Sequence, residues 1–140
     1  MPGGSVAEAL AAVQGLEGKT AIDATNLYGS TRPPQGFDSN AEYVKSITGG
    51  PTAKAFNINF ASLFDQVAAA KARPGNFWCG DEEARETVEA LCRDAGYDPI
   101  CAGPLANASM QEEVLPFIFA IAQEGGLGQY FYRFAPPETF

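Results

Sequence analysis

The chain has 140 residues, which fits one globular domain over residues 1–140. Its apolar content of 46% suits a packed core, and its net charge of −8 argues against nucleic acid as a partner. No apolar run reaches the ~18 residues that a membrane span needs. The first residues also lack a basic signal-peptide region, so we expect a cytoplasmic protein that does not bind a membrane.

The first quarter of the chain predicts a helix, a strand and a long loop. Ser5 and Glu8 have the spacing of a capping box, and apolar residues follow at helical spacing, which predicts a helix over about 6–13. Residues 19–26 predict a strand that ends in Thr25 and Asn26. A helix followed by a strand is the second half of a crossover unit, so we expect that the chain begins in the middle of a fold. Residues 27–38 predict a functional loop.

A second helix and a second strand follow this loop. Ser39 and Glu42 repeat the capping-box spacing before a short amphipathic helix that stops at Gly49. Residues 52–57 then predict a strand that ends in Asn57, and a helical segment follows at about 60–67.

Residues 76–105 predict a strand, a helix and a strand, and the rest of the chain is organised around this unit. The run 77–79 is apolar, Asp81 stands at the expected N-cap, and Gly96 ends the helix. The second strand, over 99–102, leads into a turn at residues 103–105. The length of this unit suits a right-handed parallel crossover, and ligands of open α/β sheets bind at the carboxyl ends of such strands.

The C-terminal part predicts an apolar helix and a last strand. Ser109 and Glu112 make a third capping box before a helix that is apolar on nearly every side, which predicts burial against the sheet and a possible subunit interface. Glycines at 125–128 break this helix, and residues 130–134 are β-prone. The Gly126-x-Gly128 pair is not a dinucleotide fingerprint, because Phe131 occupies the third glycine position and the segment follows a helix.

Three predicted strand ends carry groups that suit a ligand site. The first strand ends in Thr25 and Asn26, and the second ends in Asn57. The third leads into the turn of Gly103, Pro104 and Leu105. If the strands are parallel, all three lie at one edge of the sheet around a shared crevice. The alternative is that the two asparagines only terminate their strands by bonding their own backbone. Asp23, inside the first strand, is expected to be a buried carboxylate with a satisfied partner.

The absence of histidine restricts the possible chemistry. No Ser-His-Asp triad, Cys-His nucleophile or His-based zinc site can be assembled from this chain. Cys79, Cys92 and Cys101 lie in expected strands and a helix, which favours reduced core thiols over a metal or redox site. We therefore predict no metal site and no catalytic side chain. If the chain is an enzyme, we expect a cofactor to carry the reaction.

Several short motifs, in this order, resemble one oxidoreductase family. They are Ile22 to Asn26, Phe37 to Tyr43, Lys54 to Asn57, Cys79 to Asp81, Ala102 to Leu105 with Asn107, and Gly126 to Gly128 with Phe131 to Phe134. They resemble the second half of NADP-dependent oxidoreductases that use the deazaflavin coenzyme F-420, a family that also gives the reductase domain of the STEAP metalloreductases. The resemblance implies an α/β, partial Rossmann-like fold with a mostly parallel sheet and flanking helices, lacking the first βαβ half.

The resemblance also implies a cofactor and a set of contacts. It implies NADP as cofactor, with a deazaflavin or flavin as the other reactant. The cofactor contacts fall on Pro2, Thr25, Asn26, Asn57, Gly103, Pro104 and Leu105, and Gly126 and Gly128 would close the substrate pocket. The family's glycine-rich turn and its basic patch for the 2′-phosphate have no counterpart in this sequence.

Three interpretations remain open at this point. The first is a truncated or separately encoded reductase that transfers hydride between NADPH and a deazaflavin or flavin-like acceptor. The second is a non-catalytic remnant or binding module of the same fold, and the third is a half-enzyme completed by another polypeptide. Missing strands would leave residues 20–26 as an exposed edge, so we expect a homodimer or larger assembly, unless the helix over 6–13 shields that edge.

Overall fold

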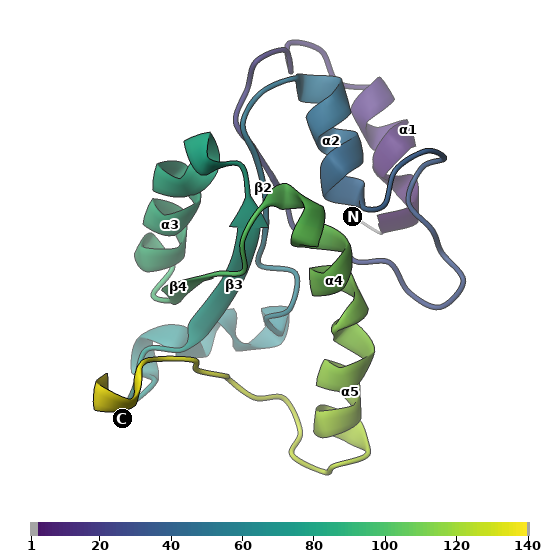
Figure 1. Cartoon of the computed structure of the whole chain (residues 1–140). Helices are drawn as coiled ribbons and strands as arrows, with labels where there is room; N and C mark the ends of the chain where they lie inside the picture. Colours follow the sequence, from purple (N-terminus) through teal and green to yellow (C-terminus); the bar gives the residue numbers. More distant parts are fainter. Residues whose placement is uncertain (1–2, 140) are drawn as a thin grey trace.

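The computed structural model describes residues 3–139 and shows a four-stranded sheet flanked by helices (Figure 1). The strands lie in the order β1 (Ala21–Asp23), β2 (Thr52–Ala55), β3 (Gly75–Gly80) and β4 (Asp98–Cys101). The α-helices are α1 (Val6–Ala11), α2 (Asn40–Thr48), α3 (Arg85–Asp94), α4 (Ala108–Glu113) and α5 (Leu115–Gln123). The expected α/β, Rossmann-like class with a mostly parallel sheet is confirmed. Within residues 3–139, no helix has the length and apolar character needed to cross a membrane.

The direction of the strands divides the sheet into two parallel pairs. β1 runs parallel to β2 with α2 between them in the chain, and β3 runs parallel to β4 with α3 between them. β2 and β3, however, are antiparallel, with Ala53 opposite Gly80. The chain between them, 56–74, forms the 3-10 helix η2 (Ala61–Ala69) and turns back instead of crossing the sheet. The predicted single edge for three strand ends is therefore wrong.

Only one of the three predicted capping boxes forms. At α2, the Ser39 hydroxyl accepts from the Glu42 N–H at 3.1 Å, the Glu42 carboxylate accepts from the Asp38 N–H at 3.0 Å, and Gly49 ends the helix with φ 62°. Ser5 makes no capping hydrogen bond at α1. Ser109 lies inside α4 instead of before it, because the Glu112 side chain turns inward to a buried partner described below.

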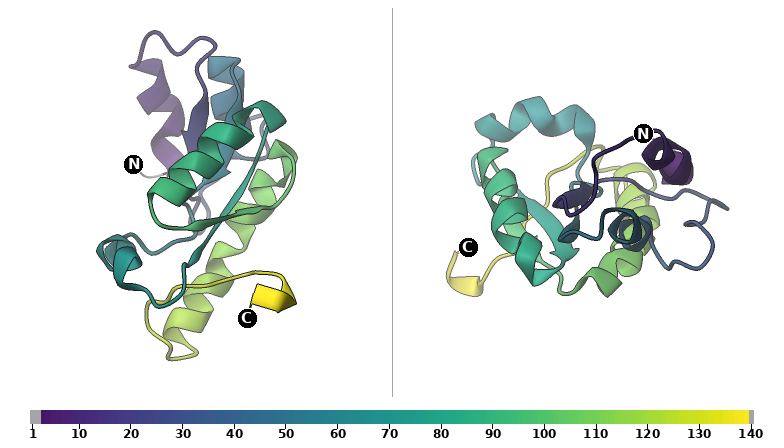
Figure 2. Two further views of the ribbon diagram at one scale, coloured as in Figure 1. Left: turned by 90° about the vertical axis from the view of Figure 1, so that its left-hand side faces the viewer. Right: turned by 90° about the horizontal axis from the view of Figure 1, so that it is seen from above.

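The two faces of the sheet have separate apolar cores. On one face α3 packs its Val88 and Cys92 against Trp78 of β3, together with Tyr97 and two alanines of β2. On the other face Ala41 of α2, Cys79 and Ala108 of α4 form a smaller cluster. The view from above shows α3 on one side of the sheet and α2 and α4 on the other (Figure 2, right). α3 therefore faces the sheet with Val88 and Cys92, whereas its Leu91 is 46% exposed.

The C-terminal segment differs from its prediction in two ways. The apolar helix is divided at Val114 into α4 and α5, and Phe117 is 64% exposed, so the helix is not buried on every side. Residues 130–134 form no strand, because Tyr132 bonds β3 through one backbone carbonyl, to Gly75 N at 2.7 Å, and through its hydroxyl, to Phe77 N at 3.1 Å. One backbone bond is not a ladder. The segment still runs back from the end of α5 to the start of β3 (Figure 1).

Candidate functional site

A hollow of about 250 Å³ opens at the carboxyl edge of β1 and β2. Amide side chains from the two strand ends line it together with aromatic rings and with apolar side chains of α5. These residues include Asn26, Asn57, Asn59, Tyr28, Phe56, Phe60, Leu115, Ile118 and Phe119. Pockets for whole small-molecule ligands are usually about 300–1,000 Å³. The hollow therefore suits one ring system and not a complete dinucleotide.

Asn26 and Asn57 are bonded to each other across the strand ends. The Asn26 amide donates to the Asn57 carbonyl at 2.6 Å, and the Asn57 amide donates to the Asn26 side-chain oxygen at 3.0 Å. The expected proximity of these side chains is confirmed. Their bonds run between neighbouring strands and hold the rim of the hollow rigid. Asn26 keeps a second N–H and a lone pair for a ligand, whereas Asn57 also donates to the Gln111 carbonyl at 3.4 Å and keeps only a lone pair.

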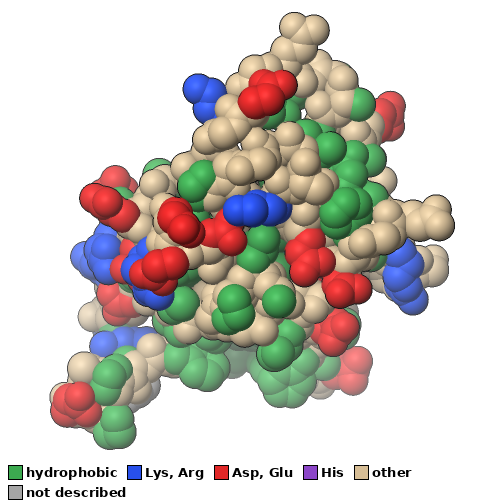
Figure 3. All heavy atoms as spheres, turned by 45° about the horizontal axis from the view of Figure 1, so that its top comes forward, with side chains coloured by type: hydrophobic (Ala, Val, Ile, Leu, Met, Phe, Trp, Pro, Cys, Tyr) green, Lys and Arg blue, Asp and Glu red, His purple; other side chains and the backbone are tan. Residues whose placement is uncertain are grey.

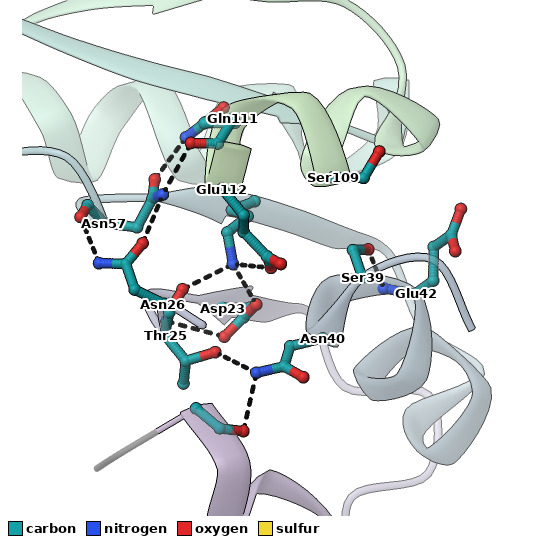
Figure 4. A network of polar contacts seen from close by, with 12 residues as sticks. Asp23, Thr25, Asn26, Ser39, Asn40, Glu42, Asn57, Ser109, Gln111 and Glu112 are labelled. Carbon is teal, nitrogen blue, oxygen red and sulfur yellow. Dashed lines mark hydrogen bonds and ion pairs between the residues drawn. The ribbon is translucent and has the colours of Figure 1, made fainter. Parts of the chain in front are cut away.

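Two further amides, which the sequence did not single out, support this pair (Figure 4). Gln111 of α4 donates to the Asn57 side-chain oxygen at 2.6 Å and to the Phe77 carbonyl at 3.2 Å. Asn40 of α2 donates to the Thr25 hydroxyl at 2.8 Å and to the Gly3 carbonyl at 2.9 Å. The edge is thus built from β1, β2, α2, α4 and the first described residues.

A buried charge cluster lies next to the amide network. The Lys54 ammonium is fully buried and contacts Asp23 Oδ2 at 2.7 Å and Glu112 Oε1 at 2.6 Å. It also donates to the Thr25 carbonyl at 2.7 Å, so its three protons have three oxygens within reach. Burial raises the pKa of the Glu112 carboxyl, and the neighbouring Lys54 opposes this shift. The expectation that Asp23 is a buried carboxylate with a partner is confirmed.

The first described residues pack closely onto this edge. A Cβ atom on Gly3 would lie 2.1 Å from the Asn26 carbonyl oxygen, so only glycine permits the approach. Pro2, which the resemblance assigns to cofactor binding, immediately precedes this contact but lies outside the described residues. Its predicted role therefore stays a prediction.

The turn over Gly103, Pro104 and Leu105 lies at the opposite edge of the sheet. It follows β4, whose carboxyl end points away from that of β2 because β2 and β3 are antiparallel. Gly103 and Pro104 line a different hollow of about 260 Å³ with Trp78, Arg85 and Cys101, and Leu105 packs against the smaller core cluster. The structure therefore does not bring these three residues to the asparagine pair.

Gly126 and Gly128 form the exposed turn that ends α5. Both have positive φ, 71° and 74°, and the Gly128 N–H donates to the Ala122 carbonyl at 2.9 Å. The segment that follows reaches the wall of the 250 Å³ hollow beside Asn26 and Asn57, since the Tyr130 ring lies 5.5 Å from that of Phe60. The glycines have a clear structural role in this turn, and their predicted role in a substrate pocket is untested.

Lys54, Glu112, Gln111 and Asn40 were missed as site residues. One signal was present, since Lys54 is a charged residue inside an apolar strand, which requires a buried partner. Glu112 and Gln111 gave no comparable signal, because Glu112 also fits a capping box and Gln111 is an ordinary helix residue. Their role depends on contacts 54 to 58 residues away in the chain.

The arrangement suits ring binding more than acid–base chemistry. The side chains that line the 250 Å³ hollow are amide, aromatic and aliphatic. On the face shown in Figure 3, which brings the top of Figure 1 forward, basic side chains are isolated or lie among acidic ones. The site can therefore stack and orient a flat ring.

Comparisons with known proteins agree with the motifs. The chain matches no family model. It is 36% identical over 104 residues to the metalloreductase STEAP3 of Rattus norvegicus, and the match covers 71% of this chain and 20% of that protein. A crystal structure from Arthrobacter sp. FB24, described as an F-420-dependent NADP reductase, superposes with a TM-score of 0.76 at 26% identity. It covers 97% of this chain and 67% of that chain.

A second solved structure, of a hypothetical protein from Sinorhizobium meliloti, gives a TM-score of 0.58 at 26% identity, with 77% of this chain and 56% of that chain covered. The chain thus spans only a fifth of the metalloreductase that it matches. The resemblance stated from the motifs is confirmed: in sequence and fold this chain is similar to F-420-dependent NADP reductases and to a STEAP metalloreductase, and its relatives indicate an NADP-dependent reductase family.

Proposed function

We propose that this chain forms the nicotinamide and acceptor end of an NADP-dependent reductase. Hydride would pass between NADPH and a deazaflavin or flavin-like acceptor at the hollow beside Asn26 and Asn57. The observation that carries the proposal is the position of this hollow, at the carboxyl edge of two parallel strands, with paired amides and aromatic rings in its lining.

The lining fits the nicotinamide ring in size and chemistry. Aromatic side chains such as Phe60 and Phe119, whose ring centroids lie 6.1 Å apart, offer apolar surfaces to a flat ring. The second N–H and lone pair of Asn26, together with the remaining lone pair of the Asn57 side-chain oxygen, can bond a carboxamide or a ribose hydroxyl. The bound cofactor supplies the hydride, and this chain's side chains orient the ring and exclude water. An acid or base from the protein is not required, which suits a chain without histidine.

The residues that the resemblance implied would have different roles in this site. Asn26 and Asn57 would contact the nicotinamide end directly, and Thr25 would support Asn26 from the end of β1. Pro2, Gly126 and Gly128 are proposed at the rim of the same site. A contact from Gly103, Pro104 or Leu105 would belong to a different part of the ligand, because these residues lie beyond the opposite sheet edge.

The phosphates of the cofactor set the expected affinity. A glycine turn at a helix N-terminus normally binds the pyrophosphate, and this sequence lacks that turn. We therefore expect NADPH to bind this chain weakly, with a Kd of roughly 100 μM or more. Calorimetric titration measures it, and submicromolar binding would show that the phosphates have a site that the proposal omits.

Turnover separates the reductase from its alternatives. The purified chain is incubated with NADPH and either a deazaflavin or flavin mononucleotide, and NADPH oxidation is followed by its absorbance. The reductase proposal predicts turnover that falls in the Asn57→Ala variant and persists in the Asn107→Ala variant, whose amide bonds Ala102 O away from the hollow. Weak binding without turnover favours the binding module, and turnover only with a second polypeptide favours the half-enzyme.

A further inference from the structure

We infer that Lys54 is a positioning residue for the proposed nicotinamide site: its ammonium, held between Asp23 and Glu112, fixes the backbone of Thr25 and thereby places Asn26 at the hollow. The inference rests on the proposed function for its ligand. Its structural part concerns this chain alone.

The backbone of Thr25 is held by the charge cluster at both of its polar groups. Its N–H donates to Asp23 Oδ1 at 2.9 Å, and its carbonyl accepts from Lys54 Nζ at 2.7 Å. Its hydroxyl accepts from the Asn40 amide at 2.8 Å. Asn26 is the next residue, so the peptide between Thr25 and Asn26 is held at its carbonyl. The close-up view shows these bonds converging on the segment that carries Asn26 (Figure 4).

Helix α4 joins the charge cluster to the amide pair through two adjacent residues. Glu112 contacts Lys54 inside β2, and Gln111 bonds Asn57 just after β2. A single turn of helix therefore contacts β2 and its end at two points, and it reaches the end of β1 through the Lys54 ammonium. Glu112 also lines a second hollow of about 430 Å³, to which Leu27 and Gly29 contribute.

Packing alone does not account for this arrangement. Two carboxylates and one ammonium lie in a nearly water-free position, where an apolar trio of the same size would often be as stable. A methionine at position 54 would fill a similar volume but would leave the Thr25 carbonyl without its charged donor. The arrangement therefore favours a role in geometry at the strand end.

The test must remove the ammonium without leaving buried carboxylates uncompensated. We choose the triple variant Lys54→Met, Asp23→Asn and Glu112→Gln, which has no buried charge at the cluster and keeps an Oδ1 acceptor for the Thr25 N–H. Glu83→Gln is the first control, because this exposed carboxylate before α3 takes no part in the charge cluster. Lys45→Met is the second, because it breaks the 2.6 Å Lys45–Asp81 pair at the opposite edge.

The measurement is NMR of the labelled chain, with and without reduced nicotinamide mononucleotide. We expect a cooperatively folded triple variant in which the Asn26 backbone and side-chain amide signals shift. We expect its affinity for the mononucleotide to fall about tenfold, the effect of losing one hydrogen bond from a displaced neutral amide. Both controls should keep the wild-type Asn26 signals and affinity.

Unchanged Asn26 signals and affinity in a folded triple variant would overturn the inference, since Lys54 would then be only structural. If the wild type binds no mononucleotide, the proposed function fails, while the Asn26 signals of the free protein still decide the positioning role. If the triple variant does not fold, a measurement on the wild-type protein still tests the inference. Nuclear Overhauser contacts from the Lys54 ammonium protons to Thr25 and Asn26 support the inference, and their absence contradicts it.

Discussion

The two edges of the sheet have similar elements and different chemistry. At the carboxyl edge of β1 and β2, the polar groups are buried and bonded across elements, as in the Asn26–Asn57 pair and the Lys54 cluster. At the carboxyl edge of β3 and β4, the charged groups are more exposed. There Arg85 pairs with Glu82 in the preceding 3-10 turn and with Glu89 in its own helix, and its guanidinium lies 5.0 Å from the centre of the Trp78 ring.

The difference follows from one antiparallel step between β2 and β3. Parallel strands alone would collect all the strand ends at one edge, whereas this sheet sends two to each side. At the β1–β2 edge, side chains of α4 and the first described residues cover and bond the polar groups. Breaking a buried, hydrogen-bonded polar network costs free energy, whereas an exposed ion pair contributes little. The contrast between the edges is therefore measurable.

The largest expected effect is the loss of Lys54. Lys54→Met leaves two buried carboxylates without their cation, which we expect to lower the free energy of unfolding by about 3–5 kcal/mol. Lys45→Met removes a partly exposed pair at the other edge, and we expect a loss of about 1 kcal/mol or less. Urea unfolding measures both. Equal losses for the two variants would remove the energetic distinction between the edges.

A smaller effect is expected for the amides. Asn57→Ala leaves Asn26 Oδ1 and one donor of Gln111 without their partner, and we expect a loss of about 1–3 kcal/mol. Asn107→Ala removes a bond to Ala102 O on the other side of the sheet, and we expect a loss of about 0.5–1 kcal/mol. The comparison uses the same substitution at both sites. An Asn107→Ala loss as large as that of Asn57→Ala would contradict it.

The pH dependence of stability offers a third comparison, through the carboxyl group of Glu112. Its carboxyl faces Lys54 and Asp23, and the Cys79 thiol also lies within electrostatic range; burial raises its pKa above the ordinary 4.5. A raised pKa in the folded state favours the protonated form. The stability that this shift contributes is therefore complete below pH 4.5 and is lost as pH rises through the folded-state pKa. We expect Glu112→Gln to remove this part of the pH dependence, with an effect smaller than that of Asn57→Ala.

Unfolding free energies measured at a series of pH values above 4.5 test this prediction. Glu83→Gln, an exposed carboxylate before α3, serves as the control and should leave the pH dependence unchanged. If the unfolding free energies of the wild type and of Glu112→Gln change with the same slope as the pH rises above 4.5, Glu112 does not titrate as its burial requires.

The smallest expected effect concerns the outer edge of β1. β1 is the last strand of the described sheet, and its outer N–H and C=O groups have no neighbouring strand within residues 3–139. Such an edge favours pairing with a second copy, so we propose a homodimer or larger assembly. Light scattering and amide exchange test it together. A monodisperse monomer in which the Ala21 to Ala24 amides exchange rapidly would contradict the assembly.

Local features of the sequence predicted much of the fold. The Ser39 capping box and Gly49 gave α2, and the run from Phe77 to Gly96 gave β3 and α3 with nearly correct limits. These elements depend on contacts within a few residues, which a sequence displays directly. The proximity of Asn26 and Asn57 also followed, because β1 and β2 form the predicted parallel neighbours.

What could not be predicted depends on distant contacts. Alternation and capping signals do not encode strand direction, so the antiparallel step and the separate position of Gly103 were missed. The Ser109 box has the same spacing as the Ser39 box, but Glu112 bonds Lys54 across the fold and is not available to cap the helix. The contacts that Gln111 and Glu112 make with β2 and its end are therefore visible only after folding.

The most direct test of the central claim is to map the nicotinamide ring onto the chain. Reduced nicotinamide mononucleotide is titrated into the labelled protein, and the amide shifts are followed by residue. Our account predicts shifts that saturate at Asn26, Tyr28, Asn57 and Phe60 and that vanish in the Asn57→Ala variant. Shifts centred on Gly103 and Cys101 at the opposite edge, or no saturable shifts, would contradict it.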